Sequence, residues 1–340
     1  MRPDQPEADD VVARPGRDRP AAAGREGVDG GDAADRVGAA DGRDRVRAAD
    51  GAAGGAYDRG TVRSGPASRA EQLAEHARLR ERVAASDQAE ADQAAWADAA
   101  PGLRDAWEQH KQRYPERMRA APGSEPDGSW GCGEHRRLDP EQNAEAGKAH
   151  ADLADEAGRH ILPALRRVEA ADPERRLAGL EHMVKGEDRL KEKLADVLFV
   201  ESQLTTRQAL ARVPDAVRFT LTYSADRYTE GVLADVARLK AAGFEEIKLK
   251  NLWDANQYKG INSQWRSSET GARFEMQFHT PESLEAKELT HEAYERLRRP
   301  EVETSQAERD DLEDFQCQVN KLVAGPPNVE TIRDFPEKKR

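Results

Sequence analysis

The hydrophobic positions of this chain are distributed unevenly, and the first part of the sequence holds very few of them. Residues 1–66 contain no Leu, Ile, Phe or Trp, and consist mostly of Ala, Gly, Asp, Arg and Pro. Such a segment buries too little apolar surface to offset the entropy that it loses on ordering, so we predict that it is disordered. Residues 67–127 favour helices with thin apolar stripes, and we interpret them as a helical linker region.

A turn-rich segment separates this linker region from the rest of the chain. Residues 121–128 combine two prolines and two glycines with Ser and Asp, a composition that favours turns and predicts a domain boundary after residue 127. Before this segment we predict two helical pieces, at about 67–99 and 103–118. Trp107 is the only strong apolar anchor of the second piece.

The spacing of apolar residues changes within the C-terminal domain, which we place at residues 128–325. The segments with helical spacing are 140–169, 173–198, 228–241, 281–298 and 305–323. The segments with alternating, strand-like spacing are 217–223, 245–251, 259–266 and 273–280. This order predicts an α+β domain with a mixed β-sheet and helices packed on one face. Residues 326–340 are rich in Pro and charged residues, and we expect a flexible tail there.

Strand alternation gathers polar residues on one face of the predicted sheet. In the last alternating segment, Glu275, Gln277 and His279 point away from three large apolar residues. The polar residues that the two preceding segments add to this face are Lys248, Lys250, Tyr258, Asn262, Gln264 and Arg266. A water-exposed face is the simpler interpretation. Cations gathered around one carboxylate and beside one aromatic ring nevertheless fit a phosphate-bearing substrate better.

Composition limits the partners of this face. The formal net charge of −12 argues against a broad nucleic-acid interface, but not against a small basic pocket for phosphates. Cys132 and Cys317 form no CxxC pair, so we expect neither a disulfide scaffold nor a zinc site. No apolar run is long enough for a membrane helix, and the first residues lack the hydrophobic stretch of a cleavable signal peptide.

A basic helical face precedes the first strand. Lys185, Arg189 and Lys193 are spaced on one side of the 173–198 helix, with Lys191 nearby,. Acidic residues are interleaved with them, so exposed ion pairs are the simpler interpretation of this spacing taken alone.

Five short motifs follow one another in the second half of the chain. They are Arg189-x-Lys191, Asp215-x-x-Arg218, Lys248-x-Lys250, Tyr258-x-x-x-Asn262 and Glu275-x-Gln277-x-His279-Thr280. In kind and order they resemble the motifs of RelA/SpoT-type alarmone synthetase domains, which make (p)ppGpp, in a divergent small or toxin-like branch. The resemblance implies a nucleotidyltransferase-like synthetase fold and an ATP-dependent pyrophosphokinase activity.

The resemblance also implies a role for each matched residue. Asp215 and Glu275 would bind Mg²⁺, and Glu275 would take the proton of the attacking hydroxyl group. Tyr258 would stack on the base of the acceptor nucleotide. The residues expected to orient the acceptor are Asn262, Gln277 and His279. The cations expected to bind the substrate phosphates are Arg189, Lys191, Lys193, Arg218, Lys248 and Lys250.

Several positions depart from the motifs of this family. Arg218 stands three residues after Asp215, where the family has Gly, while Gly260 and Asn262 stand where it has Ser and His. His279 replaces an arginine, which weakens one cation at neutral pH. Strict alternation would also place Asp215 on the apolar side of the sheet. These departures leave the identity of the acceptor open.

The implied reaction is the transfer of pyrophosphate from ATP to the ribose 3′-hydroxyl of a purine nucleotide. Two alternatives stay open: transfer to the 3′ end of tRNA, and a nucleotide-binding module that has lost catalysis. A disordered segment before a compact enzyme is also typical of a toxin that is exported without a cleavable signal peptide. Such a toxin would act in the cytoplasm, and its partner would be a neutralising antitoxin or immunity protein.

Overall fold

The computed structural model describes residues 69–115, 121–133, 136–298 and 304–336. The disorder predicted for residues 1–66 lies outside the described residues, as does the end of the predicted tail. Described residues from Leu79 onward belong to one compact unit, which contains the sheet and the site.

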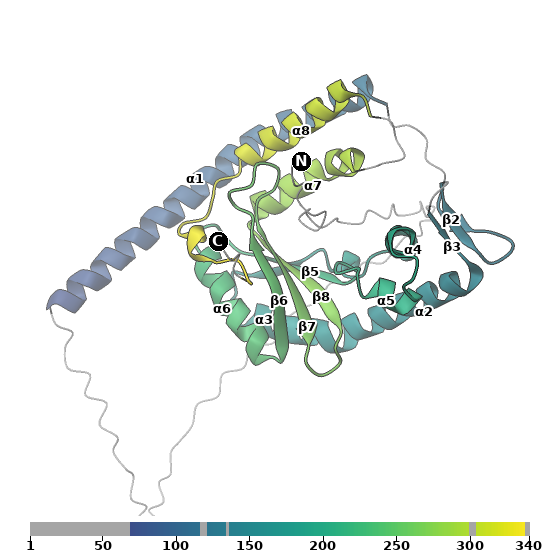
Figure 1. Cartoon of the computed structure of the whole chain (residues 1–340). Helices are drawn as coiled ribbons and strands as arrows, with labels where there is room; N and C mark the ends of the chain where they lie inside the picture. The colour runs from purple at the N-terminus through teal and green to yellow at the C-terminus, as the bar shows by residue number, and fades with distance from the viewer. Residues whose placement is uncertain (1–68, 116–120, 134–135, 299–303, 337–340) are drawn as a thin grey trace, which may run out of the picture. The chain divides into compact units, whose positions relative to one another are not determined.

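A five-stranded sheet forms the centre of this unit, in the order β4–β5–β8–β7–β6 (Figure 1). Its strands are β4 (Arg176–Ala178), β5 (Arg218–Thr222), β6 (Phe244–Asn251), β7 (Ile261–Ser267) and β8 (Arg273–His279). Strands β5 and β8 are parallel and the other neighbours are antiparallel, which confirms the predicted α+β class with a mixed sheet. Strand β4 was wrongly placed in a helix, because three residues are too few to show an alternation.

One face of this sheet is apolar, as the alternation predicts. Its buried residues are Phe219, Leu221, Trp265, Phe274, Met276 and Phe278. They form one hydrophobic cluster with residues of α3 (Leu162–Ala170) and α6 (Tyr228–Ala241). Burial of each large apolar side chain contributes roughly 1.5–3 kcal/mol, so this face fixes the register of the strands and thereby positions the opposite, polar face.

Helix α1 (Arg69–Arg113) continues through Pro101, whereas the sequence predicted two separate pieces. Trp96 and Trp107 lie on its buried side, and their packing outweighs the helix-breaking tendency of the proline. The core of the compact unit therefore includes residues that precede the predicted boundary after residue 127.

Both tryptophans of α1 also bind acidic residues of α7 (Pro281–Leu297). Trp96 Nε1 donates to Glu285 Oε2 at 2.7 Å, and Trp107 Nε1 donates to Glu292 Oε2 at 3.1 Å. These bonds fix α7 from its outer side, while its inner side faces the polar surface of the sheet.

The remaining elements surround the sheet. Helices α2 (Pro140–Glu156) and α3 are joined by the π-helical turn η2 (Ala157–Ile161), which gives the long helix predicted at 140–169. Helix α4 (Glu187–Val200) begins later than predicted, because β4 and the 3-10 turn η3 (Leu180–His182) precede it. The other elements are α5 (Thr206–Leu210), α8 (Gln306–Lys321), η4 (Val329–Thr331), β1 (Gly123–Ser124), β2 (Trp130–Cys132) and β3 (Arg136–Leu138).

Part of the predicted tail is attached to the sheet. Leu249 N donates to Phe335 O at 2.8 Å, and Phe335 N donates back to Leu249 O at 2.9 Å. Val329 and Ile332 are buried in the core, so the flexible tail expected from residue 326 is wrong for residues 326–336. Among the described helices, none has the length and apolarity needed to cross a bilayer.

Candidate active site

The polar face of the sheet carries most of the residues that the sequence indicated. One row of laterally paired residues consists of Lys248, Gln264, Glu275 and Arg218. The next row consists of Lys250, Asn262, Gln277 and Thr220. Residues that stand directly opposite each other on neighbouring strands share a face, so the predicted grouping of lysines, amides and one glutamate is present.

Asp215 joins this face from the turn that precedes β5. Because it lies outside the strand, the alternation that would send it to the apolar side does not apply. Arg218 Nη2 lies 3.2 Å from Asp215 Oδ2, and Arg218 Nε lies 2.9 Å from Glu275 Oε2. The two carboxylates on which the expected chemistry depends therefore meet around one guanidinium group.

A buried lysine completes this cluster. Lys185 Nζ lies 3.1 Å from Asp215 Oδ2, and both side chains are more than nine-tenths buried. Burial alone would raise the pKa of Asp215, but Lys185, Lys193 and Arg218 outweigh it and hold that pKa well below its usual value. Burial lowers the pKa of Lys185 to about 8, against the opposing effect of Asp215. The negative charge of Asp215 is thus compensated by the cations that surround it at the start of β5.

A hydrogen-bond chain lies at the other end of the polar face. The Tyr258 hydroxyl donates to Asn262 Oδ1 at 2.6 Å and lies 2.9 Å from His279 Nε2. His279 Nδ1 lies 2.9 Å from Ser283 Oγ. Burial, together with Lys287 and Arg218, lowers the pKa of His279 well below its usual value, so this histidine is neutral and does not supply the positive charge of the arginine that it replaces.

Tyr258 occupies a different position from the one its expected role requires. Its ring is only 2% exposed, and it meets the ring of His279 edge to face. A base that stacked on Tyr258 would need a free ring face, which this arrangement does not offer. The structure instead shows Tyr258 in hydrogen-bond contact with Asn262 and His279.

Gly260 is required by the close approach of this histidine. Its φ angle is 147°, and a Cβ atom there would lie 2.8 Å from His279 Cε1. We expect Gly260→Ala to lower the free energy of unfolding by roughly 2–3 kcal/mol, through overpacking and backbone strain. Gly271→Ala is the matched control, because Gly271 also has a positive φ but nothing within 4 Å of its Cβ position. Urea denaturation of both variants gives the comparison, and equal losses would contradict the contact with His279.

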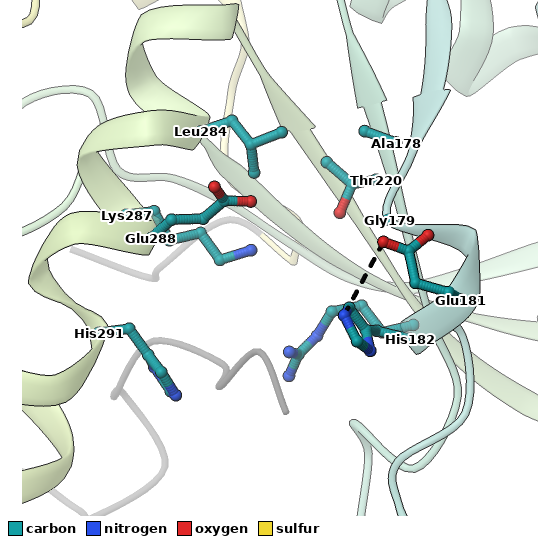
Figure 2. A pocket seen from close by; sticks show the side chains of 10 residues that line it. Ala178, Gly179, Glu181, His182, Thr220, Leu284, Lys287, Glu288 and His291 are labelled. Carbon is teal, nitrogen blue, oxygen red and sulfur yellow. Dashed lines mark ion pairs between the residues drawn. The ribbon is translucent and has the colours of Figure 1, made fainter. Parts of the chain in front are cut away.

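A cavity of about 310 Å³ adjoins the cluster (Figure 2). Its lining residues are Ala178, Gly179, Glu181, His182, Arg218, Thr220, Leu284, Lys287, Glu288 and His291. In Figure 2 the residues of α7 lie on one side and those of β4 and η3 on the other, with Thr220 of the polar face between them. The cavity size is in the range of small-molecule sites, and Arg218 belongs both to its wall and to the carboxylate cluster.

Lys287 brings a buried amine to this cavity. It is 6% exposed, and its Nζ donates to the side-chain oxygen of Gln277. Burial and Arg218 lower the pKa of Lys287 to about 7, while burial lowers that of His291 to about 4. A small rise in local negative charge, such as a bound phosphate would bring, would protonate Lys287 fully at neutral pH.

The depressed pKa of Lys287 predicts a pH dependence of stability. In the unfolded chain this lysine keeps its proton up to a pH of about 10.5, whereas in the folded chain it loses it near pH 7. The unfolded state therefore binds more protons between these values, so the free energy of unfolding should rise with pH. We expect a smaller rise between pH 7 and 9 in Lys287→Met than in the wild type, measured by urea denaturation. The control Lys321→Met, at an exposed position, should behave as the wild type, and an unchanged slope in Lys287→Met would contradict the prediction.

Helix α4 brings only some of its predicted cations to the site. Lys193 affects the pKa of Asp215 and therefore lies near the carboxylate cluster. Arg189 Nη1 lies 2.7 Å from Glu192 Oε2. Lys191 lies about 200° around the helix from Arg189, and its Nζ is 2.6 Å from Glu187 Oε1. Lys191 thus points to another side of α4, and the structure does not bring it to the cluster.

The described residues contain no group of three or more His, Cys, Asp or Glu side chains that could hold a metal ion. A metal at the carboxylates would need ligands from the substrate in addition to Asp215 and Glu275. Asp215 Oδ1 is suited to bind such a metal ion, because it is buried and has no hydrogen-bond partner.

No protein-family model and no curated protein sequence matches the chain. Among solved structures it is similar to small alarmone synthetase 2 from Bacillus subtilis, with 12% identity and a TM-score of 0.36 over 54% of this chain and 94% of that one. Small alarmone synthetase 1 from Bacillus subtilis, bound to its product pppGpp, has 11% identity and a TM-score of 0.35 over 54% and 93% of the two chains. A GTP pyrophosphokinase family protein from Streptococcus pneumoniae has 14% identity and a TM-score of 0.33 over 54% and 85%.

These solved structures include members of the family whose motifs the sequence resembles. At this level of similarity, function has to be inferred from the residues of the site itself.

Two residues of the site were missed as site residues. Helical spacing grouped Lys185 with Arg189 and Lys193, although Lys185 precedes α4. It directly follows Val184, which forms an isolated β-bridge with Val217, and this pairing brings Lys185 next to Asp215. Lys287 was not singled out. Its signal was present, because Ser283, Ala286, Lys287, Thr290 and Ala293 follow the spacing of a buried helix face, and a lysine among small residues on such a face is unusual.

Proposed function

We propose that this chain is an ATP-dependent pyrophosphokinase that transfers pyrophosphate from ATP to the ribose 3′-hydroxyl of a purine nucleotide. The observation that carries this proposal is the meeting of Asp215 and Glu275 around Arg218, a residue that also lines the adjoining cavity together with Lys287. Both carboxylates come from motifs that resemble those of the RelA/SpoT-type synthetases. Cations next to a paired carboxylate site suit a reaction in which phosphate charge has to be neutralised.

The proposed cofactor is Mg²⁺, held by Asp215 and Glu275 together with phosphate oxygens of ATP. The unpartnered Asp215 Oδ1 supports this assignment, because Mg²⁺ sites at phosphates use only one or two protein carboxylates. The ion would neutralise charge on the phosphates during transfer.

In the proposed reaction, the acceptor 3′-oxygen forms a bond to the β-phosphorus of ATP while the bond from that phosphorus to the bridging oxygen of AMP breaks. Glu275 takes the proton of the hydroxyl group, directly or through water. Gln277 Nε2 donates to Glu275 Oε1 at 2.8 Å, which orients the carboxylate. Arg218, Lys287 and Lys193 supply positive charge near the phosphates, and AMP leaves.

The acceptor-facing side of the site is assigned to the two lysines of β6 and to Asn262. Lys248 and Lys250 stand in the same rows as Glu275 and Gln277, so phosphates held by them would lie beside the proposed base. Tyr258 is assigned to hold Asn262 and His279, in place of stacking on the acceptor base.

The test of this function is thin-layer chromatography with γ-labelled ATP and a panel of acceptors: GDP, GTP, ADP, ATP and total tRNA. Label on a mononucleotide supports the proposed function, and label on tRNA would support the alternative acceptor. No labelled product with any acceptor, and no Mg²⁺-dependent release of AMP, would leave only a nucleotide-binding module.

We also propose that the activity is toxic to a bacterial cytoplasm and is restrained by a neutralising antitoxin or immunity protein. Expression of the full chain in a bacterial host tests this, with the inactive Glu275→Gln variant as control. Equal growth with both proteins, at equal amounts of folded protein, would contradict toxicity.

A further inference from the structure

The carboxylates of the cluster are already balanced by cations that belong to the chain. Asp215 and Glu275 are 4% and 5% exposed. Arg218 forms hydrogen-bonded ion pairs with both of them, and Lys185 forms a second ion pair with Asp215 Oδ2. Two buried negative charges therefore face two buried positive charges, before Lys193 is considered.

This balance opposes a free divalent cation. A metal ion that bound both carboxylates would have to displace the guanidinium group that bridges them or lie next to it. Like charges in a poorly solvated place repel strongly, and an unpaired buried arginine is costly. Sites that hold a hydrated divalent cation by protein groups alone usually have an excess of carboxylates, which the described part of this cluster lacks.

Arg218 also has a second environment available to it. It lines the cavity together with Thr220 and Lys287, so its guanidinium group lies at the border between the carboxylates and the open space. A triphosphate in the cavity would offer oxygen atoms that match the fork geometry of arginine. Its negative charge would compensate Arg218 at the moment when the carboxylates lose their partner.

We propose that Arg218 acts as an internal counter-ion, which keeps free divalent cations out of the Asp215–Glu275 pair until a triphosphate draws its guanidinium group away. This inference rests on the proposed function, since it assumes that the cavity takes a nucleoside triphosphate. Metal and triphosphate should then raise each other's affinity by the same factor.

The test measures Mn²⁺ binding, by the electron paramagnetic resonance signal of the free ion, without any nucleotide. We expect Arg218→Gln to bind Mn²⁺ at least 10-fold more tightly than the wild type, because the amide leaves both carboxylates uncompensated by this residue. Arg218→Lys should show a smaller gain, since an ammonium group cannot bridge two carboxylates as a guanidinium group does. Arg266→Gln is the matched control, because Arg266 is an exposed residue of the same sheet that pairs with Glu245, and its Mn²⁺ affinity should equal that of the wild type.

Mn²⁺ affinities in Arg218→Gln and Arg218→Lys that equal the wild-type value would overturn the proposal, provided that thermal unfolding shows both variants to be folded. If Arg218→Gln does not fold, the Arg218→Lys result decides. Equilibrium dialysis with labelled α,β-methylene-ATP, whose bond to the leaving group cannot break, distinguishes a failure of the proposed function from a failure of the role proposed for Arg218. Absence of nucleotide binding to the wild type would contradict the proposed function, whereas unchanged Mn²⁺ affinity in the variants contradicts the role of Arg218.

Discussion

Glu275→Gln is expected to lower the rate of pyrophosphate transfer from ATP by about 10³-fold, within the range found when a general base is removed. The amide cannot accept the proton of the attacking hydroxyl group, and it removes one negative charge from the pair that would hold the metal. The fold should persist, because the amide oxygen can still accept the bond that Arg218 Nε now donates to Glu275 Oε2, and only the bond from Gln277 to Oε1 is lost. Initial rates of product formation with γ-labelled ATP provide the measurement.

Glu245→Gln is the control for this experiment. Glu245 lies on β6, the edge strand of the same sheet. It is half exposed and pairs with Arg266 at the surface. Its rate should stay within about twofold of the wild type, as is usual for exposed positions away from a site. Comparable rates in the wild type and in Glu275→Gln would remove Glu275 from the chemistry and would leave the Asp215–Arg218 pair without a catalytic explanation.

Asp215→Asn is expected to lower the free energy of unfolding by about 3 kcal/mol at pH 7, because it leaves Lys185 and Arg218 buried beside a neutral amide. Loss of one partner from a buried ion pair typically costs about 3–5 kcal/mol. The pKa of Asp215 is held below its usual value in the folded chain. Its contribution is therefore complete above the ordinary carboxyl pKa of about 4 and is lost as the pH falls below it. Urea denaturation at pH 7 and pH 3 should show a smaller difference between wild type and variant at the lower pH.

A double-mutant cycle separates the ion pair from a general loss of packing. Lys185→Met removes the buried amine that Asp215 compensates, so Lys185→Met combined with Asp215→Asn should be less damaging than the sum of the two single changes. An additive double variant would show that the two residues stabilise the fold independently.

The polar face could be predicted from the sequence because its signal is local. Strand β8 alternates without interruption, and an apolar side chain at every second position determines where Glu275 and Gln277 point,. The same reasoning failed at Asp215, since the turn before β5 breaks the alternation. It also missed β4, whose three residues pair with β5 although they carry no periodicity of their own.

Other features depend on contacts between distant parts of the chain. Pro101 indicates a helix end, and only the burial of Trp96 and Trp107 explains why α1 continues past it. The burial of Tyr258 follows from its contacts with His279, which no spacing rule reports. The sequence assigned both Lys191 and Lys193 to the substrate phosphates, but the geometry of α4 brings only Lys193 near Asp215.

The parallel pairing of β5 with β8 determines when the carboxylate cluster can form during synthesis. Arg218 and Glu275 are 57 positions apart in the chain, and they meet only because these two strands lie next to each other in the same direction. Such a long-range pairing forms late, after the shorter loops have closed. A chain that has been synthesised only as far as β7 therefore contains Asp215 and Arg218 but not Glu275, and β8, which joins the β4–β5 pair to the β7–β6 pair, is still absent. The carboxylate cluster can form only after β8 has left the exit tunnel, and the cavity is completed later still by α7, which carries Lys287.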